Sequence, residues 1–157
     1  MNHFINGGII ESLPHAERAA ELAANTPRYV INLAQLYAKL DRSGEAITLY
    51  RDALNLDPRQ EHAYIGLGNL LHERGDIEGA VSNFARAATF APKSSVALNN
   101  YASLLYEVGN FEEALKYSQR ILKLDQSHLP ARRRVGKILR QHGLTSEALA
   151  NNLEGLK

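Results

Sequence analysis

The sequence contains no cysteine, no tryptophan and a single methionine. The absence of cysteine excludes disulfides, thiolate metal sites and cysteine nucleophiles. Neither sign of charge is in excess, because 18 basic and 17 acidic residues leave a net charge of +1. No global field therefore selects nucleic acid, a membrane or an acidic ligand. Any electrostatic selectivity must be local.

Leader-like features and long apolar runs are also missing. The first ten residues contain no lysine or arginine, and Asn6, Gly7 and Gly8 break their apolar stretches, which is unlike a signal peptide. No apolar stretch approaches the roughly 18 residues that span a bilayer. We expect a soluble protein with no membrane partner and the cytoplasm as its default location. A hydrophobic content of 45% is enough for a continuous core.

What the sequence does contain is a repeat of 34 residues. Ala46, Ala80, Ala114 and Ala148 recur at this interval, which is the length of one helical hairpin. Because a hairpin cannot bury its apolar face alone, the pattern predicts an all-α superhelix, a solenoid of stacked antiparallel hairpins. We divide the chain into an N-terminal segment, a capping helix or partial repeat, three complete repeats and a truncated fourth repeat: residues 1–13, 14–26, 27–60, 61–94, 95–128 and 129–157.

Small residues fill two positions of each repeat. The eighth position holds Ala34, Gly68, Ala102 and Gly136, and the twentieth holds the alanine series. In an antiparallel helix pair, a small side chain at the crossing lets the two backbones approach while larger neighbours interlock around it. We therefore expect both positions to lie where the two helices of a hairpin meet.

The fifteenth position predicts the turn between the two helices. Gly75, Gly109 and Gly143 occupy it, and glycine readily adopts the left-handed conformation that ends a helix before the chain reverses. The first repeat has Asp41 at this position. Its neighbours are also turn formers, so we expect a somewhat different turn geometry there.

The two ends of the array have their own patterns. An alanine-rich segment over residues 14–25 predicts a helix with Ser12 as its N-cap and Pro14 in its first turn. We interpret it as the second helix of a partial hairpin that shields the first repeat. A helix is also predicted over residues 146–156, with nothing after it to act as a polar cap. Either the chain was cut from a longer protein or this face pairs with another copy.

These features resemble the tetratricopeptide repeat family. The family's pairing of a large and a small residue recurs in Leu33-Ala34, Leu67-Gly68 and Tyr101-Ala102. The resemblance covers residues 27–157, and it implies a non-enzymatic scaffold for protein–protein interaction. It also implies that the first helix of each repeat lines a concave peptide-binding groove. The sequence departs from the family at the fourth position, where the usual tryptophan is replaced by Val30, Tyr64, Leu98 and Arg132.

The positions that the resemblance places in the groove are rich in amides and end in a basic helix. An asparagine amide can donate to and accept from a peptide backbone at once, so a row of asparagines holds an extended chain without demanding a particular sequence. The alternative is that these amides are ordinary solvated residues. The candidate peptide-binding residues are Asn32, Gln35, Asn69, Asn99, Asn100, Arg133, Arg134 and Lys137.

The strongest local charge signal lies on the first helix of the fourth repeat. Arg133, Lys137 and Arg140 recur there at i, i+4 and i+7, with Arg134 adjacent and no acidic residue between them. Such a face can take acidic side chains, a C-terminal carboxylate or a phosphate. The alternative is a solvated face that Glu107 partly neutralises. Nucleic acid is disfavoured, because the stripe is short and has no interleaved aromatic residues for stacking.

No constellation predicts catalysis or a cofactor. No two histidines have the i, i+4 spacing of a zinc site on a helix. No serine–histidine–acid set and no phosphate-cradling glycine loop emerges, so we expect neither enzyme activity nor a bound metal. The carboxylate clamp of chaperone-binding relatives looks incomplete, because Ile65 and Pro130 replace its two lysines.

Three functions remain open at this point. The first is a scaffold that binds an extended peptide or a partner helix in the groove. The second is the substrate-recruiting region of a larger enzyme such as a glycosyltransferase. The third is a self-assembling module that forms a homo-oligomer through its C-terminal helix. In all three, the chain binds a protein or a peptide. The basic residues on the first helix of the fourth repeat favour an acidic ligand.

Overall fold

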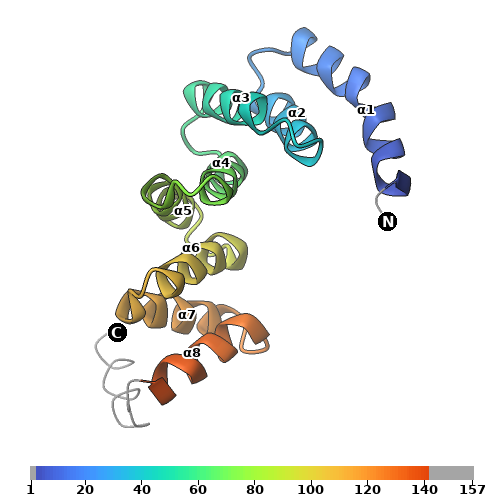
Figure 1. The fold of residues 1–157 in the computed structure, drawn as a ribbon. Helices are drawn as coiled ribbons and strands as arrows, with labels where there is room; N and C mark the ends of the chain where they lie inside the picture. The colour runs from blue at the N-terminus through green and yellow to red at the C-terminus, as the bar shows by residue number, and fades with distance from the viewer. Residues whose placement is uncertain (1–2, 142–157) are drawn as a thin grey trace. The chain divides into compact units, whose positions relative to one another are not determined.

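The computed structural model describes residues 3–141 of the chain, and over these residues it contains helices and no strand (Figure 1). This confirms the all-α prediction. The helices are α1 (His3–Leu22), α2 (Pro27–Lys39), α3 (Ser43–Leu56), α4 (Glu61–Glu73), α5 (Ile77–Phe90), α6 (Ser95–Glu107), α7 (Phe111–Leu124) and α8 (Leu129–Gln141).

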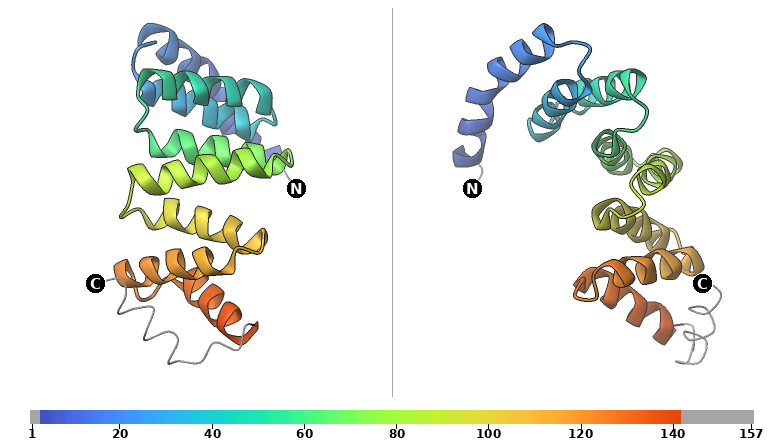
Figure 2. Two further views of the ribbon diagram at one scale, coloured as in Figure 1. Left: turned by 90° about the vertical axis from the view of Figure 1, so that its left-hand side faces the viewer. Right: turned by 180° about the vertical axis from the view of Figure 1, so that it is seen from behind.

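The chain divides into two compact units, Met1–Pro92 and Lys93–Lys157. In the first unit, α2 pairs with α3 and α4 pairs with α5, while α1 packs on α2 and α3 packs on α4. In the second unit, α6 pairs with α7, and α8 packs on α7 and also touches α6. Over the described residues, the first unit is built from two helical hairpins and α1, and the second from one hairpin and α8, as Figure 2 shows from two further directions.

The small residues of the repeat lie at close helix contacts. Ala34, Ala46 and Ala80 have no exposed surface. A Cβ atom added to Gly68 would lie 2.6 Å from Cε1 of Phe84 in the following helix, far inside van der Waals contact. In the described hairpins, small residues at the eighth and twentieth positions therefore lie where the two helices pack closely.

The three described hairpin turns share a left-handed residue and one backbone hydrogen bond, but the first differs from the other two in detail. The N–H groups of Ile77 and Phe111 donate to the carbonyl oxygens of Gly75 and Gly109 at 3.0 and 2.9 Å, and the first turn has no corresponding bond. Asp41 has a φ of 60°, next to 80° for Gly75 and 81° for Gly109. In each turn the following residue donates its N–H to the carbonyl oxygen five residues earlier at 2.8–2.9 Å: Arg42 to Tyr37, Asp76 to Leu71 and Asn110 to Leu105. This bond belongs to the Schellman motif, which aspartate enters at a higher conformational cost than glycine.

The residue that follows the left-handed one in each turn is the N-cap of the second helix, and only two of these three residues make a side-chain cap. Asp76 accepts a hydrogen bond from the N–H of Gly79 at 2.9 Å, and Asn110 caps α7 in the same manner. Arg42 makes no such cap. Its guanidinium lies 4.1 Å from the ring centre of Tyr37 and pairs with Glu45. The first turn is thus held by side-chain contacts where the others use a cap.

The N-terminal helix differs from its predicted bounds. The sequence predicts a helix over residues 14–25 after a separate N-terminal segment, whereas α1 runs from His3 to Leu22 with Pro14 inside it. An internal proline removes one backbone hydrogen bond without necessarily ending a helix. At the other end, the N–H of Thr26 donates to the carbonyl oxygen of Ala23 at 2.8 Å, so residues 23–26 form a turn and the helix ends before the predicted residue 25.

The helix α8 is the first helix of the fourth repeat. It buries Ala131, Val135 and Ile138. Its predicted partner over residues 146–156, and with it Gly143, Ala148 and the proposed pairing surface, lies outside the described residues.

Candidate functional site

Arg134 lies on the buried side of α8. Ala131, Val135 and Ile138 form the core-facing stripe of this helix at i, i+4 and i+7. Arg134 occupies the i+3 position of the same stripe, and the residue is only 8% exposed. The periodicity of α8 therefore carries a basic side chain into the interior of the second unit.

Three neutral oxygens hold the guanidinium group of Arg134. Its Nη1 donates to Oγ of Ser118 at 3.0 Å, while Nη2 donates to Oδ1 of Asn99 at 3.0 Å and to Oγ of Ser103. Ser118 in turn donates its hydroxyl to the carbonyl oxygen of Ala114 at 2.6 Å. Burial lowers the pKa of Arg134, because leaving water disfavours the charged form. Side chains from α6 and α7 thus solvate a cation that belongs to α8.

A cavity of about 290 Å³ opens beside this network. Ser103 and Tyr106 of α6 line it, together with four residues of α8: Pro130, Arg133, Arg134 and Lys137. The ring of Tyr106 packs edge-on against Phe111 at 5.4 Å between ring centres. Its hydroxyl donates to Oε1 of Gln141 at 3.4 Å. One wall of the cavity is therefore aromatic and the other is basic.

The positively charged side chains that line the cavity form no ion pair with a carboxylate of the described residues. Arg133 and Lys137 are exposed one helical turn apart, and none of the ion pairs among residues 3–141 involves α8. Like charges at this spacing destabilise an isolated helix by about 0.2–0.5 kcal/mol. Together with the buried charge of Arg134, they form a site that an anionic group would stabilise.

The structure brings only some of the predicted site residues together. Arg133, Arg134 and Lys137 share the cavity, and Asn99 contacts it through Arg134. Asn100 is half-buried on α6 and does not line it. The other three candidates belong to the first unit, where Asn32 and Asn69 are exposed on α2 and α4 and Gln35 is half-buried on α2. Their role in binding stays a prediction.

Sequence reasoning selected Arg134 as a ligand contact and missed the residues that hold it. Ser103, Tyr106 and Ser118 were not among the candidates. The available signal was the stripe of Ala131, Val135 and Ile138, which places residue 134 toward the core. A buried arginine requires oxygen acceptors on the packing helices, because an unpaired buried charge is costly.

Other kinds of site are not found in the described part of the chain. No group of three or more histidine, cysteine, aspartate or glutamate residues within it is arranged to hold a metal ion. No helix among the described residues combines the length and apolar character needed to cross a bilayer.

Comparisons with known proteins match the repeat pattern. Two family models, both described as tetratricopeptide repeat, match residues 31–95 and 71–135. Among curated proteins, the chain is similar to Superkiller protein 3 of Saccharomyces cerevisiae, with 30% identity over 115 residues. The matched region is 72% of this chain and 8% of that protein. The chain therefore spans a small part of the length of this relative.

Solved structures share the fold. The crystal structure of YrrB, described as a TPR protein with an unusual peptide-binding site, has a TM-score of 0.76 and 26% sequence identity. The match covers 86% of this chain and 70% of that one. The crystal structure of MamA has a TM-score of 0.77 and 16% identity, over 93% of this chain and 85% of that one, and supports the fold alone.

The fold and the similar proteins support the same family assignment. The helical hairpins, the 34-residue period and the small residues at the helix crossings form an all-α solenoid of tetratricopeptide type. Proteins of this kind are typically non-catalytic scaffolds for protein interaction. By its family models, its repeat pattern and its fold, the chain belongs to the tetratricopeptide repeat family.

Proposed function

We propose that this protein is an interaction scaffold that binds an extended acidic peptide along the first helices of its repeats, with the cavity between α6 and α8 as the anchor. The observation that carries the proposal is the cluster of Arg133, Arg134 and Lys137 around one cavity, with no carboxylate of the described residues paired to it. A peptide carboxylate placed there would gain charge-assisted hydrogen bonds.

The two exposed cations and the buried one have different parts in this proposal. Arg133 and Lys137 can reach a ligand directly, and each charge-assisted hydrogen bond contributes about 1.5–3 kcal/mol. Arg134 is already engaged by Ser118, Asn99 and Ser103. It lines the cavity and supplies positive potential from within. Affinity therefore depends most directly on the exposed pair.

Peptide binding is supported by the likeness to YrrB, whose structure is described as having an unusual peptide-binding site. The amides of α6 fit the same proposal, because Asn99 and Asn100 are only half-buried on the helix that forms one side of the cavity. An extended peptide needs partners for its backbone groups, and side-chain amides supply both donors and acceptors.

The test is a screen of short random peptides on an array, each made with a free carboxylate and with an amide at its C-terminus. The best binder is then titrated calorimetrically against the full chain and three variants. Arg133→Ala and Lys137→Ala should each weaken binding about tenfold, corresponding to about 1.4 kcal/mol. Arg140→Ala removes the same charge from the same helix but does not line the cavity, so it should retain affinity. Equal losses in all three variants, or preference for neutral peptides, would overturn the proposal.

A further inference from the structure

A second cavity lies in the first unit, among α1, α2 and α3, with a volume of about 670 Å³. Cavities of about 300–1,000 Å³ are large enough to bury a small ligand or a few side chains. Val30 and Leu33 are buried beneath it, whereas Leu56 is 43% exposed at its edge. The apolar lining residues are Ala20, Ala24, Val30, Leu33, Leu49 and Leu56. We call this cavity the N-terminal groove.

On the side of α1, the groove is lined by the small residue Ala20 and by Glu17 and Glu21. Figures 1 and 2 show that α1 approaches α2 near its C-terminal end and diverges from it toward the N-terminus.

The groove is lined by acidic residues, although the whole chain has no excess of acidic residues. Glu17, Glu21 and Asp52 line it, and no lysine, arginine or histidine does, although the whole chain has a net charge of +1. The hydroxyl of Tyr37 donates to Oε1 of Glu17 at 2.8 Å and holds that carboxylate at the rim. Glu21 pairs with Arg18 at 3.1 Å, but both side chains are about two-thirds exposed, so the pair is weak.

The chemistry of the lining favours a helical occupant. An extended segment would bring unpaired backbone N–H and C=O groups against an apolar surface, at a cost of about 1–3 kcal/mol for each one left unsatisfied. The walls of the groove are helices, whose own backbone groups are already paired. A helix satisfies its backbone internally and can present apolar side chains at i, i+3, i+4 and i+7.

We propose that the N-terminal groove binds a basic amphipathic helix of another protein. Its apolar face would cover Ala24, Leu49 and Leu56, and lysine or arginine side chains along its edges would meet Glu21 and Asp52. This surface is separate from the cavity between α6 and α8 and has the opposite charge preference. The protein would then carry two docking sites, one for an acidic peptide and one for a basic helix.

The test uses two designed helical peptides that differ only in charge. Both carry leucine at i, i+3, i+4 and i+7; one has lysine at the flanking positions and the other has glutamate. Binding to the full chain is measured by fluorescence anisotropy at physiological salt. The lysine peptide should bind at least tenfold more tightly than the glutamate peptide.

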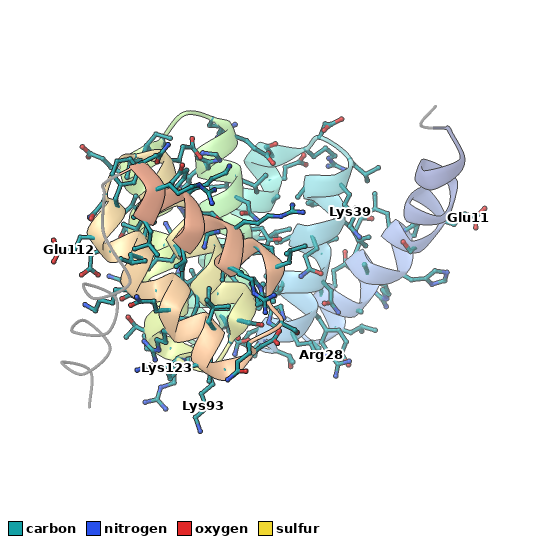
Figure 3. The ribbon with its side chains drawn as sticks, turned by 90° about the horizontal axis from the view of Figure 1, so that it is seen from below. Glu11, Arg28, Lys39, Lys93, Glu112 and Lys123 are labelled. Atoms are coloured by element: carbon teal, nitrogen blue, oxygen red, sulfur yellow. The ribbon has the colours of Figure 1, made fainter. Side chains whose placement is uncertain are left out.

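Charge reversal locates the site. The double variant Glu21→Lys/Asp52→Lys should weaken binding of the lysine peptide at least tenfold and improve binding of the glutamate peptide. Both residues are exposed, so the variant should fold, which circular dichroism checks. Glu11→Lys is the matched control, because Glu11 is an exposed residue of α1 that does not line the groove and points away from α2 (Figure 3).

The outcomes separate clearly. A preference for the lysine peptide that the double variant reverses and Glu11→Lys leaves unchanged supports the proposal. Equal binding of the two peptides, no binding, or equal effects of the double variant and the control would overturn it. Sedimentation velocity of the free protein addresses a different occupant. Self-association that the double variant abolishes would assign the groove to a second copy of this chain and overturn the partner named here.

Discussion

Two contacts between neighbouring repeats involve the same two repeat positions, but the large side chain comes from a different one of these positions in each contact. In the first unit, the ring of Tyr50 on α3 covers Gly66 of α4, where an added Cβ atom would lie 2.2 Å from Cζ of the ring. In the second unit, Ser118 of α7 accepts a hydrogen bond from Arg134 of α8 at 3.0 Å. The residues of each pair are 16 positions apart. A large residue contacts a small one in both cases. In the first contact the large residue is on the second helix of the earlier repeat, and in the second contact it is on the first helix of the later repeat.

This difference shows that the two contacts both pair a large side chain with a small one, although the chemical groups that meet are different. When α3 supplies the filling group, the contact is an aromatic ring against bare backbone. When α8 supplies it, the contact is a buried cation that neutral oxygens solvate, beside a cavity with two more positive charges. The two contacts therefore differ in which position carries the large residue, and only the contact of Arg134 is part of a candidate binding site.

The largest expected effect comes from making the first contact resemble the second. Gly66→Arg should lower the free energy of unfolding by about 3–5 kcal/mol, because the side chain collides with Tyr50 and buries a charge without partners. Urea denaturation followed by circular dichroism measures it. Gly44→Arg is the control, since an added Cβ atom there meets nothing within 4 Å, and it should be nearly neutral. Similar losses in both variants would show that the ring of Tyr50 does not limit this position.

A rescue sharpens this prediction. Adding Tyr50→Ser to Gly66→Arg should recover part of the loss, since it supplies space and one acceptor. Adding Ile31→Asn should recover more, because Ile31 stands where the second unit has Asn99. Coupling between neighbouring sites of this kind is about 0.5–3 kcal/mol. Strict additivity of the three substitutions would contradict the correspondence between the two contacts.

The reverse experiment removes the buried cation. Arg134→Ala should lower the free energy of unfolding by about 2–3 kcal/mol, since it leaves a void and strips Ser118, Asn99 and Ser103 of a shared donor. Arg134→Met fills the same space without a charge to desolvate, so it should cost less than the alanine variant. Chemical denaturation of both variants measures the difference. A methionine variant no more stable than the alanine variant would mean that hydrogen bonding outweighs packing at this site.

The contact between Tyr50 and Gly66 also predicts a loss of stability at alkaline pH. Burial raises the pKa of Tyr50 to about 12 from its usual 10. The folded state therefore favours the neutral phenol, and this stabilisation is complete below pH 10 and lost as the pH rises through 12. The loss should reach roughly 2–3 kcal/mol. Tyr50→Phe should flatten the curve between these values, leaving a smaller slope from Tyr37 and Tyr101, whose pKa values are also raised. An unchanged curve would contradict the burial of this hydroxyl.

The smallest expected effect concerns the hairpin turns. Asp41→Gly should raise the free energy of unfolding by about 0.5–1 kcal/mol, because glycine adopts its φ of 60° at lower cost. Gly75→Asp should lower it by a similar amount, since both positions have a left-handed φ and are followed by the same backbone hydrogen bond. Thermal unfolding of the two variants provides the comparison. Shifts of the same sign would show that the turns are not equivalent.

Much of the fold could be predicted from the repeat, whereas the candidate site could be predicted only in part. The 34-residue period and the small residues at positions such as Ala34 and Gly68 predicted the hairpins and their close contacts. The exposure of Arg133 and Lys137 followed from their helical spacing. The hydrogen bonds of Arg134 could not be predicted in the same way, because they depend on residues 16 to 35 positions away on two other helices.

The sequence by itself determined that this protein is a chain of helical hairpins of one family, because apolar periodicity and turn residues act within a single repeat. Only the tertiary structure decided how each contact is filled. It turned Arg134 inward onto Ser118, gave Asp41 a left-handed φ like that of Gly75, and left a groove beside Ala20 of α1. These outcomes depend on the volumes and dipoles of side chains from different helices, which pack to a fixed density only when the helices meet.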